Sequence, residues 1–269
     1  MSTTADHVLE LLLNQAGFLR ADGNRRTGLV GAQEARERVD AHLRYGVLFR
    51  EMEVGSTSSD LVYETPGVGQ VSGTPCIYLK VLQDPSPERV ADLRMRLWNH
   101  GRIPTLWVVT QNSVRIYDAF ARPQEEDKRE IRRHLLGELQ CIGDQLRGLD
   151  EFHRRNFDSG AFWKSGAGRR IDTQQRVDQA LLRDLADTEQ LLRNEGLSPT
   201  IAHSLLGRTI FVKYLEDRGI LQPLHFRVHG AANFRETLGD EATAQSFFEW
   251  LRATFNGDYH FRTLNGVVQ

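Results

Sequence analysis

Two apolar stretches decide the fold: Asp60-Leu61-Val62-Tyr63 and, after a glycine-rich segment, Pro75-Cys76-Ile77-Tyr78-Leu79-Lys80-Val81-Leu82. Their apolar, β-branched and aromatic residues are typical of strands, and the second run suits a buried central strand. Because alternate residues of a strand point to the same side, Tyr78 and Lys80 share one face of the sheet. The first stretch opens on an acid, Asp60, and the second contains a base, Lys80.

An acid on one strand and a lysine on the next is the pattern of many metal-dependent nucleases. Mg²⁺ prefers oxygen ligands, and two carboxylates commonly fix it beside the scissile phosphate, where a lysine orients water and stabilises charge. Asp60 can supply a metal ligand, and Lys80 stands where the lysine is expected. Such sites usually carry a second acid two residues before the lysine, where this chain has Tyr78. A phenol is a poor ligand for a hard metal at neutral pH.

Three hypotheses follow for Asp60 and Lys80. In the first, a nuclease-like module engages DNA or a partner without cutting. In the second, a relocated acid completes a Mg²⁺ site with Asp60 as metal ligand, and Asp60, Lys80 and Glu37 are the catalytic residues. In the third, Asp60 only caps a turn and Lys80 lies at a sheet edge. Further candidates for the relocated acid are Glu34, Glu53 and Glu64.

The segments around these strands predict a mixed α/β sheet. A helix begins in the Pro- and acid-containing stretch at residues 84–88, and Gly101 stops it. The tight turn Gln111-Asn112 joins two strands into a hairpin. We expect helices over residues 6–16, 33–45 and 84–99, and strands over residues 47–54, 60–63, 76–82, 105–110 and 114–120, with Gly46 ending the second helix.

The pattern changes after a polar, charged stretch at residues 121–130. Beyond it, apolar residues recur at helical spacing almost throughout. We therefore expect an α/β domain over residues 1–122 and an α-helical domain over residues 123–269. Helices are expected over residues 131–152, 172–194, 199–217 and 241–255, and a connecting loop over residues 156–170.

Composition limits the function classes. A formal net charge of −2 argues against coating nucleic acid by bulk attraction but is compatible with a local basic groove. The two cysteines predict no disulfide framework, and the nine histidines form no cluster with zinc-ligand spacing. No apolar run reaches the roughly 20 residues of a membrane span, and no signal peptide is evident. We therefore expect a cytoplasmic location and no membrane partner.

Basic residues between the two expected domains form a second candidate site. We expect them to contact the phosphates of double-stranded DNA, with Trp163 as a stacking aromatic. The alternative is that they form a solvated face or pair with nearby acids. This basic strip consists of Arg154, Arg155, Lys164, Arg169 and Arg170.

Several segments resemble one family and together touch most of the chain. Pro75–Lys80 has the form Pro-x-Ile-Tyr-x-Lys, and Trp98–Pro104 has the form Trp-Asn-x-Gly-Arg-x-Pro. Leu205–Leu221 is similar to a helix that leads toward a catalytic domain, and Phe255–Asp258 to a short signature that follows it. These segments look like the N-terminal region of bacterial adenine-specific DNA methyltransferases and of single-chain, type IIG-like restriction–modification proteins.

The resemblance implies a restriction-endonuclease-like module of the PD-(D/E)xK type, followed by an α-helical connector domain. It also implies a role in restriction–modification or anti-phage defence. Methylation is not implied, because the S-adenosylmethionine loop and the Asn/Asp-Pro-Pro-Tyr/Phe tetrapeptide are absent from the 269 residues. The chain ends about where that catalytic domain would begin, so we expect either a fragment or a stand-alone protein that shares the front half.

These observations lead to one expectation and two alternatives. The leading expectation is a DNA-engaging component of a bacterial defence system, with a nuclease-like fold that lacks a complete metal site. The first alternative is a scaffold that docks a DNA methyltransferase or another defence subunit, which the near-neutral charge and the long helical half favour. The second is an active Mg²⁺-dependent DNA endonuclease.

Overall fold

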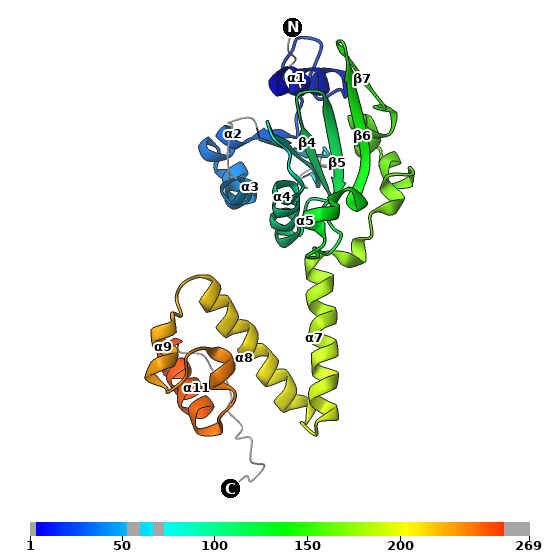
Figure 1. Ribbon diagram of the computed structural model, residues 1–269. Helices are drawn as coiled ribbons and strands as arrows, with labels where there is room; N and C mark the ends of the chain where they lie inside the picture. The colour runs from blue at the N-terminus through cyan, green and yellow to red at the C-terminus, as the bar shows by residue number, and fades with distance from the viewer. Residues whose placement is uncertain (1–3, 53–59, 67–72, 256–269) are drawn as a thin grey trace. The chain divides into compact units, whose positions relative to one another are not determined.

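The computed structural model describes residues 4–52, 60–66 and 73–255 of the chain (Figure 1). The chain forms two compact units, which meet in the sequence between Leu181 and Leu182. We call the residues up to Leu181 the sheet unit and those from Leu182 the helical unit. The expected α/β class and the expected helical C-terminal region are both confirmed.

The sheet unit is built on one seven-stranded sheet whose strands lie in sequence order. Among the described strands, β3 and β4 form the one parallel pair, and all other neighbours are antiparallel. The helix α4 (Pro87–His100) makes the crossover that a parallel pair requires. The strands are β1 (Leu29–Gly31), β2 (Leu61–Glu64), β3 (Pro75–Val81), β4 (Thr105–Val109), β5 (Ser113–Asp118), β6 (Leu135–Ile142) and β7 (Gln145–Arg147).

The two faces of the sheet are covered by different parts of the chain (Figure 1). One face packs on α1 and on aromatic residues that follow β7, and the other packs on α2, α3 and α4. Alternation along β3 sends Ile77 and Leu79 to the first face and Tyr78 to the second. Besides α4, the helices of the sheet unit are α1 (Ala5–Gln15), α2 (Ala32–Glu37), α3 (Val39–Met52), α5 (Asp127–Glu130) and α6 (Arg154–Asp158).

The ends of α4 follow from local sequence signals. The side chain of Ser86 accepts a hydrogen bond from the main-chain N–H of Arg89 at 3.4 Å, and Pro87 occupies the first turn. Gly101 closes the helix in the left-handed conformation, with φ of 72°. A Cβ on Gly101 would lie 2.6 Å from Val177, so the close approach also favours glycine there.

The segment 47–54, expected as a strand, is helical as far as Met52, and Gly46 lies inside α3. The prediction was wrong because the short apolar run at residues 47–49 fits a strand and a buried helix equally well. Helical spacing decides the outcome, since one side of α3 is buried along its whole length. The side chains that α3 buries are Ala41, Tyr45, Leu48, Phe49 and Met52.

The segment 131–152, expected as a helix, contains β6 and β7 instead. These strands continue the sheet beyond β5, so the expected boundary at residues 122/123 falls inside the sheet unit. Gly143, with φ of 60°, and Asp144 form the two-residue turn between the strands. Residues 156–170, expected as a loop, form α6 and short 3-10 turns that pack Phe157 and Phe162 on the sheet.

The helices expected over residues 172–194, 199–217 and 241–255 are present, the first of them beginning in the sheet unit, and two short helices between the last two were not expected. α7 (Val177–Asn194) begins later than residue 172, because the Asp172 side chain caps a 3-10 turn by accepting from the N–H of Gln174. In the described part of the chain, no helix is both long enough and apolar enough to cross a membrane. The remaining helices are α8 (Pro199–Asp217), α9 (Pro223–Val228), α10 (Phe234–Thr237) and α11 (Glu241–Phe255).

Candidate functional site

Asp60 and Lys80 meet because of the register between β2 and β3. Leu61 lies opposite Leu79 and Val62 opposite Tyr78. Asp60 immediately precedes β2, so the same register sets it opposite Lys80. Directly opposite residues of an antiparallel pair point to the same face, which brings the two side chains together.

The Asp60 carboxylate is the centre of a buried polar cluster. Its Oδ2 lies 2.6 Å from the Lys80 ammonium and accepts a hydrogen bond of 2.9 Å from the Tyr78 hydroxyl. The ammonium also donates to the main-chain carbonyl of Met52 at 2.9 Å. Lys80 is 0% exposed and Asp60 is 2% exposed, so solvent does not screen the pair. We call Asp60, Tyr78 and Lys80 the buried triad.

The ammonium of Lys80 also lies at the end of a helix. Met52 is the last residue of α3, and its carbonyl is one of those left without a partner inside the helix. A cation at this end interacts favourably with the helix dipole. Lys80 is not at a sheet edge, contrary to the third hypothesis, since β3 pairs with β2 on one side and with β4 on the other.

The residues around Asp60 that the structure describes do not fit a Mg²⁺ site. The described residues contain no group of three or more His, Cys, Asp or Glu side chains that could hold a metal ion. Tyr78 occupies the place of the second acid, and Oδ2 of Asp60 already accepts two hydrogen bonds.

The candidates for a relocated acid that the structure describes are engaged elsewhere. Glu37 is exposed and accepts a hydrogen bond from Gln33 at 2.9 Å. Glu34 pairs with Arg38. Glu64 lies 2.7 Å from Arg44 and accepts a hydrogen bond from the Tyr45 hydroxyl. Glu53 lies outside the described residues.

Two residues of the basic strip bond to other parts of the sheet unit. Arg154 donates to the Gly17 carbonyl at 2.8 Å and pairs with Asp158, and Arg170 donates to the carbonyls of Leu135 and Leu136. These two arginines hold the chain after β7 in place. Arg170 is nevertheless exposed to solvent, as are Arg155, Lys164 and Arg169, and the neighbouring Trp163 is 37% exposed.

A second buried ion pair was not anticipated from the sequence. Arg94 on α4 is 0% exposed and pairs with Asp127, which also contacts Arg133 and His134. Burial raises the pKa of Asp127, but hydrogen bonds from His134 and the Gln124 main chain, with the Arg94 charge, bring it to about 2. One signal was available, since Arg94 lies between Val90 and Leu97 on the buried side of α4.

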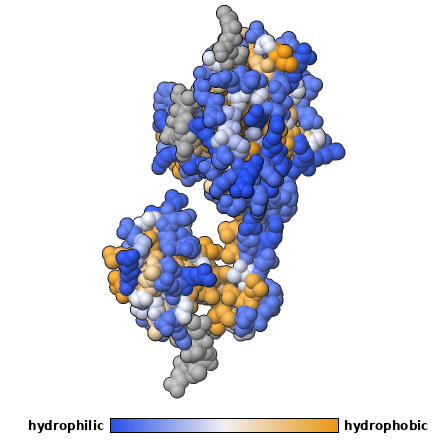
Figure 2. All heavy atoms as spheres, in the orientation of Figure 1, coloured by the Kyte–Doolittle hydropathy of each residue, from blue (hydrophilic) through white to orange (hydrophobic). Residues whose placement is uncertain are grey.

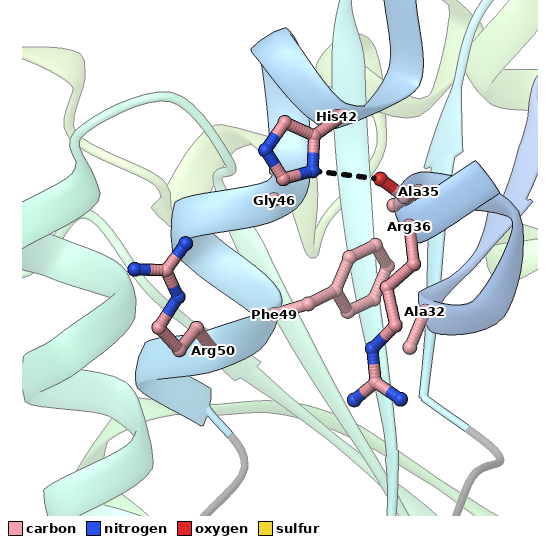
Figure 3. Close-up of a pocket in the computed structure, with 7 residues that line it drawn as sticks. All are labelled: Ala32, Ala35, Arg36, His42, Gly46, Phe49 and Arg50. Atoms are coloured by element: carbon pink, nitrogen blue, oxygen red, sulfur yellow. Dashed lines mark hydrogen bonds between the residues drawn. The ribbon is translucent and has the colours of Figure 1, made fainter. Parts of the chain in front are cut away.

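A pocket of about 250 Å³ lies between α2 and α3 (Figure 3). It adjoins the buried triad, because the ring of its lining residue Phe49 packs against Tyr78 with centroids 6.0 Å apart. The sequence analysis did not predict it, since the part of α3 that carries Phe49 and Arg50 was expected to be a strand. The lining residues are Ala32, Ala35, Arg36, His42, Gly46, Phe49 and Arg50.

Comparison of the chain with protein-family models, with curated proteins and with solved structures gave no match.

Proposed function

We propose that the sheet unit is a restriction-endonuclease-like module that binds double-stranded DNA without cutting it, in a restriction–modification or anti-phage defence system. The observation that carries the proposal is the buried triad. An acid and a lysine meet across an antiparallel strand pair, as in nucleases that use this frame, while Tyr78 stands in place of the second acid.

The strand order supports the nuclease-like part of the proposal. The antiparallel pair of β2 and β3 leads through α4 to the parallel strand β4. This gives a mixed sheet with the lysine on β3, the acid immediately before β2, and helices on both faces. The triad lies on the α3 and α4 face, below the end of α3.

The state of Asp60 supports binding without cleavage. Metal-assisted hydrolysis needs carboxylate oxygens that are open to the cation and to the scissile phosphate. The carboxylate of Asp60 is buried, and its Oδ2 is held by Lys80 and Tyr78. In this proposal the triad therefore stabilises the fold and takes no part in cleavage.

The exposed members of the basic strip supply the DNA contacts in this proposal. Arg155, Lys164 and Arg169 are exposed, and each can contact a phosphate. The partly exposed ring of Trp163 adds a stacking surface in the same short segment. The net charge of −2 is no obstacle, because phosphate contacts depend on the local arrangement of charge.

Binding of the whole chain to a labelled DNA duplex, measured by fluorescence anisotropy at several salt concentrations, tests the proposal. We expect the affinity to fall steeply between about 50 and 200 mM salt, as several phosphate contacts require. Incubation of the same duplex with Mg²⁺ or Mn²⁺ should leave it intact. Cleavage that Lys80→Ala abolishes would replace the proposal with an active endonuclease, and absent binding at low salt would overturn it.

Exposed apolar side chains of the helical unit favour a second candidate function, a scaffold that docks a DNA methyltransferase or another defence subunit. Leu191 is 64% exposed, Leu224 is 65% exposed and Val228 is 74% exposed. Figure 2 shows apolar side chains on the surface of this unit. Contiguous exposed apolar surface commonly marks a protein-interaction site.

The scaffold can be tested independently of DNA. An adenine-specific DNA methyltransferase mixed with the whole chain should co-elute with it in size-exclusion chromatography, and Leu224→Glu should abolish the shift. Arg252→Ala, which changes an exposed position of α11 on the same unit, is the control. Separate elution, or co-elution that Leu224→Glu leaves intact, would remove the scaffold as a candidate.

A further inference from the structure

The outer side of α3 carries three exposed apolar side chains in a row. Val39 is 76% exposed, Leu43 is 80% exposed and Val47 is 56% exposed. They are four residues apart, so they lie one above another on a single side of the helix. The opposite side of α3 is buried in the core of the sheet unit, and Figure 1 shows the helix on the outside of that unit. We call Val39, Leu43 and Val47 the apolar stripe.

The apolar stripe differs from the rest of the surface of the sheet unit. Leu43 is the most exposed large apolar side chain among the described residues. Single apolar residues scattered over a surface are normal, whereas a contiguous exposed set commonly marks an interface. The other large apolar side chains that are exposed in the described part of this unit come from four different elements: Met95, Ile142, Trp163 and Leu181.

The order of residues in the apolar stripe is the same in both directions along the helix. Val39 and Val47 are each four residues from Leu43. A second copy of α3 turned through 180° about Leu43 therefore places its Val47 on Val39 and its Leu43 on Leu43. A contact in which both copies use the same surface is the commonest kind in homo-oligomers. The antiparallel order also puts the positive N-terminal end of each helix beside the negative C-terminal end of the other.

The charges beside the apolar stripe also fit an inverted copy. Asp40 and Arg44 lie along one edge of the stripe, 3.2 Å apart, with side chains 55% and 27% exposed. Asp40 is three residues before Leu43, and Arg44 is one residue after it. Inversion about Leu43 therefore brings Arg44 of the second copy to within about 3 Å of Asp40 along the helix axis, on the same edge of the contact. A parallel copy would put these groups of the two chains on opposite edges, where they do not pair.

We propose that the chain forms a two-fold dimer in which the α3 helices of two copies pack antiparallel through the apolar stripe. The contact uses one helix from each copy, so it lies at the small end of specific interfaces, which bury about 1,200–2,000 Å². We therefore expect a weak dimer, with a dissociation constant on the order of 10 µM. The dimer contact includes no residue of the basic strip and lies on the sheet unit, whereas the scaffold candidate uses the helical unit.

The variant Leu43→Glu tests the centre of the apolar stripe. Leu43 is exposed in the single chain and glutamate is a good helix former, so the fold should be retained, which urea unfolding checks. In the dimer, two carboxylates would meet in an apolar contact. We expect the dissociation constant, measured by sedimentation equilibrium of the whole chain, to rise about 100-fold or more. The matched control is Leu224→Glu, which changes a leucine that is 65% exposed on the helical unit and should leave the dimer unchanged.

Cysteine cross-linking tests the antiparallel order. A disulfide requires two Cα atoms within about 7 Å of each other. Position 43 meets itself at the two-fold axis, so Leu43→Cys should give a disulfide-linked dimer on oxidation. The two copies of position 39 lie about 12 Å apart along the helix axis, so Val39→Cys should cross-link only when it is mixed with Val47→Cys. Each variant also carries Cys141→Ser, because Cys141 is partly exposed whereas Cys76 is buried.

Three outcomes would overturn the inference. A chain that stays monomeric well above the expected dissociation constant forms no α3 dimer, and the apolar stripe is then a surface for a different protein. A dimer that Leu224→Glu dissociates and Leu43→Glu leaves intact is formed by the helical unit. Val39→Cys that cross-links with itself as fast as Leu43→Cys does would show a parallel pair. Loss of the dimer in Leu43→Glu alone, together with the expected pattern of cross-links, would support the antiparallel dimer whether or not the chain binds DNA.

Discussion

The ammonium of Lys80 donates a hydrogen bond of 2.9 Å to the carbonyl of Met52, so a side chain from the centre of the sheet holds the last residue of α3. The same ammonium pairs with Asp60, and both groups are buried. Removing one partner of such a pair leaves an uncompensated charge in the interior. We expect Lys80→Met to lower the free energy of unfolding by about 3–5 kcal/mol, measured in urea.

A double-mutant cycle shows whether this loss comes from the pair. The double variant Lys80→Met/Asp60→Asn should lose much less unfolding free energy than the two single variants lose in sum. The reason is that the second change removes the charge that the first left unpaired. Additive losses would mean that Asp60 and Lys80 contribute to stability independently, and would contradict a stabilising interaction between them.

The hydroxyl of Tyr78 provides a smaller test of the same cluster. Tyr78→Phe removes the hydrogen bond to Asp60 but keeps the ring that packs on Phe49. We expect a loss of about 1–2 kcal/mol in the free energy of unfolding. Tyr214→Phe is the control, since Tyr214 is 53% exposed and lies in the helical unit. A smaller loss for Tyr78→Phe than for the control would contradict the role of the hydroxyl.

The two classes of residue in the basic strip should respond differently to alanine substitution. Lys164→Ala and Arg169→Ala should each weaken binding to all DNA sequences and reduce the salt slope by about 1, as loss of a phosphate contact does. Arg154→Ala should instead lower the urea midpoint, because Arg154 bonds Gly17 and Asp158. A stability loss in Lys164→Ala, or an unchanged salt slope, would argue against its assigned contact.

Asp127 should make the stability of the sheet unit depend on pH. Its pKa is about 2 in the folded chain, against about 3.9 for an unfolded aspartate, so the unfolded state takes up the proton first. The stabilisation is complete above about pH 4 and is lost as the pH falls toward 2; it amounts to about 2 kcal/mol.

The variant Asp127→Asn isolates this contribution from that of the other carboxylates. Near neutral pH it should be about 3–5 kcal/mol less stable than the unmodified chain, because Arg94 stays charged in a buried position. The difference in unfolding free energy, measured in urea at several pH values, should shrink as the pH falls below 4. A difference that stays constant with pH would contradict the assignment.

The sequence predicts the parts of the fold that carry local signals. The helix α4 has a serine cap, a proline in its first turn and a closing glycine, and α8 has Ser198 and Pro199 at its start. The strands β2, β3, β4 and β5 also lie close to the expected positions. Strand periodicity was enough to set Tyr78 and Lys80 on one face.

The errors arose where local patterns are ambiguous. Apolar residues in 131–152 recur at a spacing that also suits a helix, and the strands there are stabilised by pairing with β5, which is distant in sequence. The available signal was the Gly143-Asp144 dipeptide, which favours a hairpin. A second signal was the glycine at position 137. In the structure, a Cβ at Gly137 would lie 2.5 Å from the ring of Phe152.

Of the candidate site, only the pairing of the acid with the lysine could be predicted from the sequence. The pairing of Asp60 with Lys80 follows from strand register, but their burial depends on α3, of which the sequence pattern identified only the part up to Tyr45. The pair of Arg154 with Asp158 agrees with the alternative that these arginines bind nearby acids. The contacts of Arg154 with Gly17 and of Arg170 with Leu135 could not be predicted, because these main-chain carbonyls are far away in the sequence.

The burial of Lys80 has a consequence for chemical labelling. It is the only lysine before Lys128, and the whole chain contains two more, Lys164 and Lys213. Because its amine is enclosed and paired, acylating dyes and amine-directed cross-linkers should modify the other three lysines and spare the first. A native preparation in which an acyl group appears on Lys80 would therefore report opening of the sheet beneath α3.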